Sequence, residues 1–267
     1  MKTKKFLASF IVSSSVLFPF AVVSADSNKT DISISNNGDV SLVIPEDADK
    51  VLKNTDNQVK YIIGDGATLN NNSEDVSLSS PVVVDTKITD QTDGSTTGVT
   101  TYEADLAQAE VIENGNDQSF NLGSIILSQL FGTKVFADNN TYVNKWEKTS
   151  TIKFYETIYW KTTASSSVVT KVTGGYQNRG TTASDRQTTV TSSSVEIATS
   201  GPNTSGKGLY VQQIKTWNLG TKTSWSISPG YKPIKTPASS TRGGAIYRAN
   251  IKHGNSKWSL TLSQQVF

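Results

Sequence analysis

The chain has 267 residues, a formal net charge of only +2, one histidine and no cysteine. The lack of cysteine excludes disulfide bonds and a lipoprotein attachment site, and together with the single histidine it argues against a transition-metal site. We predict that the protein holds no cofactor.

The small net charge hides a division along the chain. Residues 26–138 contain 19 acidic and 6 basic side chains, whereas residues 139–267 contain 4 acidic and 16 basic ones. All five tryptophans lie in the second part. We interpret the chain as two physically different segments, of which only the basic one has enough rings and alternating strands to build a solid interior.

Residues 1–25 have the pattern of a secretory signal peptide. Three lysines within the first five residues precede an apolar run that ends in Val23-Ser24-Ala25. Serines and Pro19 interrupt this run, which argues against a permanent anchor of about 20 unbroken apolar residues. We expect cleavage after Ala25 and a secreted mature chain without a transmembrane segment, as in an exported protein of a Gram-positive bacterium.

Residues 26–121 form an acidic N-terminal region. The stretch DISISNNGDVSLVI alternates apolar and polar residues on both sides of Asn37-Gly38, which predicts a β-hairpin. Further short strands are expected at 59–63, 82–84 and 99–102. Because long polar stretches separate them, two alternatives stay open: a small, loosely packed β subdomain, or a mostly disordered acidic arm or propeptide.

Residues 122–138 are predicted to be an apolar helical connector, since the apolar residues recur at roughly helical spacing. The end of this segment, Val135-Phe136-Ala137-Asp138, has the same small-residue pattern as the predicted signal cleavage site. Cleavage after Ala137 is therefore the alternative to a helix that packs on a neighbouring surface.

From residue 139 onward the pattern predicts β-strands. Apolar side chains alternate on one face of STIKFYETIYW and of KWSLTLSQQV. Other strands are expected near 167–173, 187–198, 209–219, 223–227 and 245–252, separated by turns rich in Gly, Pro and Asn. About seven short antiparallel strands favour an all-β fold with a C-terminal antiparallel β-sandwich over residues 139–267, and a closed sheet is the second choice.

Three short motifs in this part resemble those of a group of uncharacterised, small, secreted β-rich proteins of Gram-positive bacteria. They are VTKVTGGY from Val169 to Tyr176, Ser184-Asp-Arg186, and NSKWSLTL from Asn255 to Leu262. The resemblance implies export and an all-β domain. It brings no catalytic residues with it.

Candidate catalytic groups are few. His253 lies in a His-Gly-Asn turn, and no GxSxG-like elbow supplies a nucleophile for it. Of the acids in residues 139–267, only Glu156 interrupts an apolar strand face, and a strand edge or a salt bridge explains it as well as catalysis does. Acidic clusters at 46–49 and 64–66 lack the ligand spacing of a calcium loop. We predict that the protein is not an enzyme.

Aromatic side chains beside lysines are the candidate ligand contacts. Trp160 and Trp258 share apolar strand faces and are assigned to the core. The predicted ligand-binding residues are Lys145, Trp146, Lys148, Trp217, Lys222 and Trp225. The excess of cations biases an exported protein toward an anionic cell-wall polymer or membrane surface, without specific recognition of nucleic acid. The opposing interpretation is that the lysines face the chain's own acidic segment.

These observations lead to a functional hypothesis: a secreted, non-enzymatic binding or surface-associated protein whose basic domain contacts anionic cell-envelope material. The acidic region would then shield the basic one until it is displaced or removed. The alternative is a membrane-active toxin or bacteriocin-like effector with an acidic propeptide. In that case the polar stretch 162–200 would rearrange into a pore hairpin, although it lacks the sustained alternation of a membrane strand.

Overall fold

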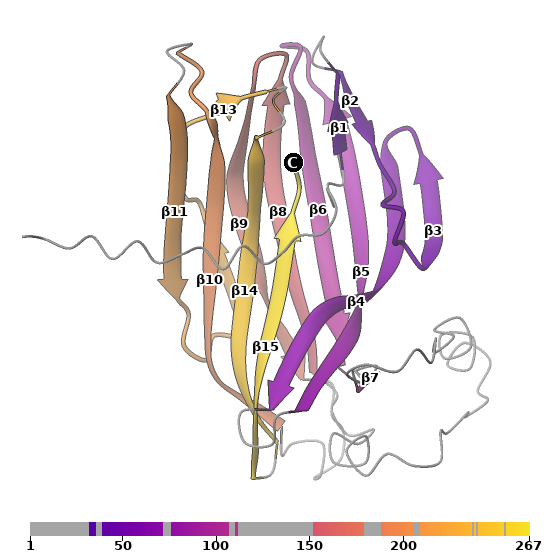
Figure 1. Ribbon diagram of the computed structural model, residues 1–267, viewed down its shortest axis with the longest axis vertical. Coiled ribbons are helices and arrows are strands. Elements are labelled where there is room, and N and C mark those ends of the chain that lie inside the picture. Colours follow the sequence, from indigo (N-terminus) through magenta and orange to yellow (C-terminus); the bar gives the residue numbers. More distant parts are fainter. Residues whose placement is uncertain are drawn as a thin grey trace, which may run out of the picture.

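The computed structural model describes residues 32–35, 39–71, 76–106, 110–111, 152–178, 188–205, 209–236, 238, 240–253 and 255–267. About three quarters of these residues lie in β-strands (Figure 1). The strands are β1 (Ile32–Ile34), β2 (Val40–Leu42), β3 (Lys50–Thr55), β4 (Gln58–Asn71), β5 (Val76–Asp90), β6 (Thr96–Asp105), β7 (Glu110–Val111), β8 (Ile152–Thr163), β9 (Ser166–Asn178), β10 (Thr188–Pro202), β11 (Tyr210–Asn218), β12 (Ser224–Ile227), β13 (Ile234–Lys235), β14 (Arg242–His253) and β15 (Ser256–Gln265).

Most of the strands belong to one large antiparallel sheet. Its order is β11-β10-β14-β15-β4-β5-β6-β8-β9-β12, with β3 paired to β4, β7 to β5 and β13 to β9. The strands β1 and β2 form a separate hairpin, in the register Ile32 to Leu42. The predicted all-β, antiparallel class and the hairpin are confirmed.

The sheet curls, so that β10, β14 and β15 lie in front of β6, β8 and β9 (Figure 1). The two layers touch through aromatic rings, since the ring centroids of Phe154 in β8 and Tyr247 in β14 are 5.8 Å apart. Near one end of the layers, Ile234 of β13 bridges to Asn203, directly after β10, while β13 itself pairs with β9. The packing is therefore that of a sandwich made from a single curled sheet.

Alternation of side chains decides which face of each strand enters the interior. In β6 and β8, every second residue is buried and its neighbours are half-buried, the period of two that a strand requires. In β10 the phase of this alternation shifts near a bulge between Val190 and Ser192. The sequence pattern of the basic part was therefore a sound guide to its strands.

The separation of the chain into an acidic part and an independent basic interior is wrong. Strand β6 pairs with β8 from Thr96–Thr162 to Asp105–Lys153, and β15 pairs with β4 from Trp258–Asn71 to Leu262–Ala67. Strands of the acidic region thus lie in the middle of the sheet, between strands of the basic region. Both regions supply one core cluster, which includes Tyr61, Leu69, Val82, Tyr102, Trp160, Ile197, Leu260 and Leu262.

The acidic strands are also longer than predicted, because the expected strands at 59–63 and 82–84 are parts of β4 and β5, which have 14 and 15 residues. The additional parts of these strands contain many Ser, Thr, Asn and Gly residues. They were not predicted because they lack the apolar pattern from which strands were inferred. Pairing with neighbouring strands supplies the hydrogen bonds and the buried face that a lone polar strand lacks. Of the two alternatives for this region, the folded one holds for residues 39–71 and 76–106.

Candidate functional site

Glu156 is the most unusual side chain of the interior. It lies in β8, between Tyr102 of β6 and Gly174 of β9, and is completely buried. Neither oxygen of its carboxyl group has a hydrogen-bond partner among the described residues. Both explanations offered from the sequence fail, because β8 is a central strand and no described residue forms an ion pair with this group.

Several other buried polar groups of the interior are satisfied by hydrogen bonds. The Trp160 indole donates to Thr100 over 3.4 Å, and the Thr86 hydroxyl donates to the Thr100 hydroxyl over 3.1 Å. At the end of the strand, Ser167 links Thr162 and Thr236 through two hydrogen bonds of 2.9 Å. Buried polar side chains in proteins are usually paired in this way.

Two further buried polar atoms near Glu156, the Tyr247 hydroxyl and the Trp225 indole nitrogen, make no well-formed hydrogen bond among the described residues. The Trp225 ring covers Gly174, the cross-strand neighbour of Glu156, and its centroid is 5.4 Å from that of Tyr247. Burial raises the pKa of Glu156 to about 8. Burial also raises the pKa of Tyr247 to about 12, opposed by polar contacts with Ser193 and Trp225.

Within this cluster, Glu156 holds a proton and is not accessible to a substrate from solvent. At neutral pH, the carboxyl group of Glu156 is mainly protonated and neutral, which reduces the cost of its burial. General acid or base catalysis requires contact with a substrate, and this group has no exposed surface. The protonation of Glu156 therefore affects the stability of the interior.

The outer face of β10, β14 and β15 carries a group of cations that we call the basic face, defined by Arg248, Lys252 and Lys257. Lys252 of β14 lies directly opposite Lys257 of β15, and both are exposed. Neither lysine has a carboxylate within ion-pair distance among the described residues. Arg248 has only a long contact of 3.9 Å with Glu196. Like charges directly opposite each other destabilise a strand pair, so an anion placed between them would relieve this repulsion.

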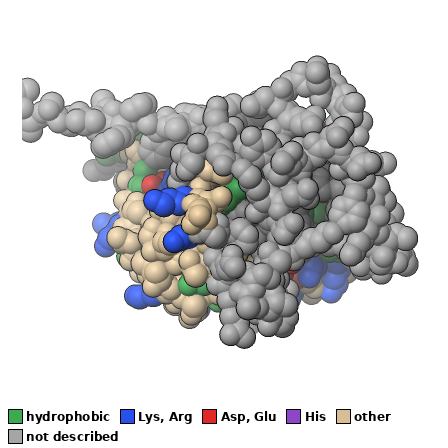
Figure 2. Space-filling view, turned by 90° about the horizontal axis from the view of Figure 1, so that it is seen from below, with side chains coloured by type: hydrophobic (Ala, Val, Ile, Leu, Met, Phe, Trp, Pro, Cys, Tyr) green, Lys and Arg blue, Asp and Glu red, His purple; other side chains and the backbone are tan. Residues whose placement is uncertain are grey.

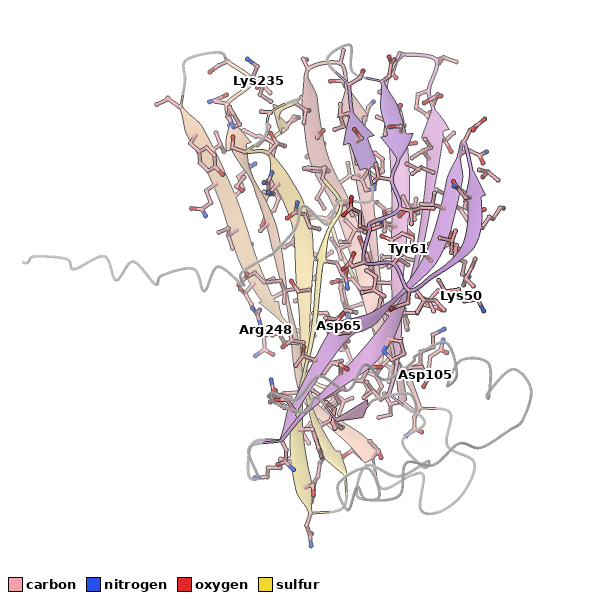
Figure 3. The ribbon with its side chains drawn as sticks, turned by 45° about the vertical axis from the view of Figure 1, so that its right-hand side comes forward. Lys50, Tyr61, Asp65, Asp105, Lys235 and Arg248 are labelled. Carbon is pink, nitrogen blue, oxygen red and sulfur yellow. The ribbon has the colours of Figure 1, made fainter. Side chains whose placement is uncertain are left out.

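A ladder of hydroxyl and amide groups lies beside these cations and stiffens the surface. The Asn250 amide donates to Ser192 over 2.8 Å, and Ser259 donates to the Asn250 oxygen over 3.1 Å. Farther along, Ser77 donates to Asn70 over 2.7 Å. Figure 3 shows Arg248 projecting from β14 away from the sheet, and Figure 2 shows Lys and Arg side chains on the described surface at the end where β14 and β15 turn.

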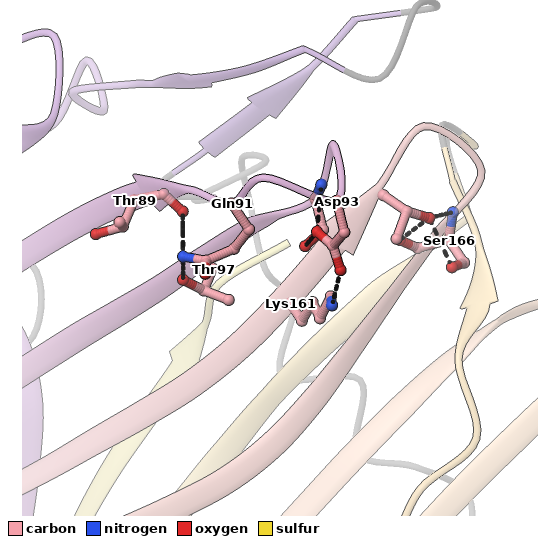
Figure 4. A network of polar contacts seen from close by, with 8 residues as sticks. Thr89, Gln91, Asp93, Thr97, Lys161 and Ser166 are labelled. Atoms are coloured by element: carbon pink, nitrogen blue, oxygen red, sulfur yellow. Dashed lines mark hydrogen bonds and ion pairs between the residues drawn. The ribbon is translucent and has the colours of Figure 1, made fainter.

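Other lysines are already neutralised by the acidic region. Lys161 of β8 contacts Asp93 over 3.0 Å, as Figure 4 shows, and Lys153 contacts Glu103 over 2.5 Å. Hydrogen bonds from Ser95 and from Lys161 hold the pKa of Asp93 well below its usual range. The suggestion that basic residues face the chain's own acidic segment is thus correct for β8, but no such pair is present for Lys252 and Lys257 in the described part of the chain.

Three of the six ligand-binding residues that the sequence predicted lie among the described residues, and they do not form one exposed surface. The ring of Trp225 is buried against Tyr247, and Lys222 lies exposed in the turn before β12. Trp217 is half-buried on edge strand β11, with the Lys215 ammonium 5.2 Å from its ring centroid. Lys145, Trp146, Lys148 and the processing residues Ala25 and Ala137 lie outside the described residues, as does the predicted connector.

Sequence reasoning missed Arg248, Lys252 and Lys257. Their signal was present: Lys252 and Lys257 are equally spaced about Gly254-Asn255, a sequence typical of a turn. A hairpin centred on that turn places the two lysines opposite each other.

Comparison with protein-family models, curated proteins and solved structures finds no match. The function must be inferred from the chemistry of the surface. Among the described residues, no group of three or more His, Cys, Asp or Glu side chains could hold a metal ion. The same residues include no helix that is long and apolar enough to cross a membrane.

Proposed function

We propose that this protein is an exported, non-enzymatic binding protein, and that its basic face contacts a linear phosphate-bearing polymer of the cell envelope. The observation that carries the proposal is the exposed, unneutralised pair of Lys252 and Lys257 on neighbouring strands. Export is supported by the pattern of residues 1–25, which remains a sequence prediction.

The charge distribution favours a polymer over a small anion. A single exposed ion pair contributes only about 0 to 1 kcal/mol, so useful affinity requires several contacts with one chain of anions. The basic face supplies three cations, and the hydroxyl and amide groups between them can donate further hydrogen bonds to phosphate oxygens. Binding of this kind weakens as salt concentration rises.

The acidic region cannot act as a shield that simply moves aside. Strands β4 to β6 are held between β15 and β8, so removing them would break the sheet and expose its core. Instead, this region neutralises Lys153 and Lys161 on one layer. The cations of the other layer are left for a ligand.

The test measures binding of the chain from residue 26 to 267 to poly(glycerol phosphate) at low and high salt. Replacing both Lys252 and Lys257 with Gln should weaken binding about tenfold at low salt, the effect of losing two exposed ionic contacts. The matched control replaces Lys50 and Lys53 of β3 with Gln, which changes the net charge equally at a distant strand. Equal loss in both variants would contradict a defined basic face.

A dye-release measurement, combined with the binding test, distinguishes this proposal from a membrane-active effector. Strands β9 and β10 follow each other in the chain but are not paired, because β9 lies between β8 and β12 while β10 lies between β11 and β14. A pore hairpin would have to leave both sets of pairs. Dye release from phosphatidylglycerol vesicles, together with weak binding to the phosphate polymer, would favour the effector and contradict the binding protein.

A further inference from the structure

A second surface, on the outer side of β4, β5 and β6, has a different chemistry. It contains a hollow of roughly 150 Å³, which we call the central hollow. Its walls combine apolar, hydroxyl, cationic and anionic side chains. They belong to Lys60, Val83, Asp85, Lys87, Val99, Thr101 and Glu103.

The strand register continues this surface onto β8. Glu103 lies opposite Tyr155, and Val99 lies opposite Tyr159, so two half-buried tyrosines border the central hollow. Thr101 and Thr157 hydroxyls are 3.1 Å apart between them. The Lys171 ammonium lies 4.0 Å from the Tyr159 ring centroid, whereas Tyr155 is next to Gly175 on β9, a residue without a side chain.

The charged groups of the central hollow are balanced and only partly used. Gln58 donates to Asp85 over 2.7 Å, and Lys60 is 3.8 Å from the same carboxylate. Glu103 contacts Lys153. A carboxylate can accept about four hydrogen bonds, so both acids retain free lone pairs. Lys87 is exposed, and no carboxylate lies within ion-pair distance of it among the described residues.

This composition excludes several kinds of ligand. Lys60 and Lys87 balance Asp85 and Glu103, so the hollow has no net charge that would attract a polyanion, a metal cation or a basic peptide. A peptide cannot add as a strand here, because β4, β5, β6 and β8 are each paired on both sides. The apolar floor of Val83 and Val99 is too small for a lipid chain and suits one face of a ring.

We propose that the central hollow and Tyr155 form a binding site for a neutral saccharide chain. Sugar hydroxyl groups donate to the free lone pairs of Asp85 and Glu103 and accept from Lys87. The less polar face of one sugar ring packs on Val83 and Val99, and the next ring packs against Tyr155. Ligand sites of this type combine an apolar floor with a few convergent polar groups. The proposal does not depend on the basic face, which lies on the other layer.

The experiment titrates the chain from residue 26 to 267 with neutral hexasaccharides of glucose, N-acetylglucosamine and mannose in 0.5 M salt, which suppresses ionic binding. The methyl resonances of Val83 and Val99 report on the site. At least one hexasaccharide should shift them in a saturable way. Absence of a saturable shift with all three sugars would overturn the proposal.

Two variants test the geometry. Val99→Trp fills the hollow without removing a hydrogen bond and should lower affinity at least tenfold, and Lys87→Ala should lower it severalfold. The matched control is Val51→Trp on β3, where the valine is exposed and aromatic residues are compatible with a strand. Thermal unfolding confirms that each variant is folded. Equal affinity of the Val99 and Val51 variants would place the sugar elsewhere and overturn the proposal.

Discussion

The acidic and basic regions of the chain differ in charge and aromatic content, yet they build one sheet with one interior. Strands β4, β5 and β6 of the acidic region are central, and strands of the basic region flank them on both sides. The regions differ on their outer faces: Lys60 faces Asp85 at the central hollow, whereas Lys252 of β14 lies opposite Lys257 of β15, with no carboxylate within ion-pair distance of either lysine among the described residues. The division of charge along the chain thus specifies two surfaces of one folded unit.

The largest effect is expected when the chain is divided, which tests whether the basic region can fold without the acidic strands. A fragment of residues 139–267 lacks the strands between β15 and β8, so its core residues Leu260 and Leu262 lose their cover. We expect the fragment to show no cooperative thermal unfolding, because the lost strands supply a large part of the apolar burial.

Mixing this fragment with a second one, residues 26–138, should restore a cooperative transition in circular dichroism. A fragment of residues 139–267 that unfolds cooperatively on its own, at the temperature of the whole chain, would show that the basic region is independent after all.

The next effect concerns Glu156, an acid inside the basic region. Its pKa is raised from 4.5 to about 8 in the folded state, so between these values the unfolded chain loses a proton that the folded chain keeps. The contribution of Glu156 to the free energy of unfolding is therefore greatest below pH 4.5. It falls as the pH rises toward 8, by on the order of 5 kcal/mol. Above that pH its contribution changes little.

Replacing Glu156 with Gln should flatten the pH dependence of urea unfolding between pH 5 and 8, since Gln has the same shape and does not ionise. The control, Glu196→Gln, changes a partly exposed acid on the outer face of β10. If the wild-type midpoint does not fall with rising pH in this range, Glu156 is not held neutral in the interior. The tyrosines near it, Tyr176 and Tyr247, titrate above this range because burial raises the pKa of each.

The smallest expected effect concerns an ion pair between the two regions. Lys161 of the basic region and Asp93 of the acidic region form an exposed ion pair. Lys161→Ala should lower the melting temperature slightly, and the decrease should vanish in high salt because exposed pairs are screened. A double-mutant cycle with Asp93→Asn measures the coupling energy of this pair. A value of zero at low salt would show that the ion pair does not stabilise the fold.

Several local features of the fold could be predicted from the sequence. Alternation in STIKFYETIYW and KWSLTLSQQV predicted β8 and β15, and Asn37-Gly38 predicted the hairpin of β1 and β2. These features depend on residues close together in the chain: the period of two sets the buried face, and a tight turn needs residues that tolerate its backbone angles.

The order of the strands in the sheet could not be predicted from the sequence. The backbone hydrogen bonds that join β4 to β15 and β6 to β8 are the same for any side chain, so composition could not reveal that acidic strands lie at the centre. That arrangement buried Glu156 in a central strand and brought the lining residues of the central hollow together from three strands. The reason is physical: a strand gains its partners, and hence its burial, from residues far away in the sequence.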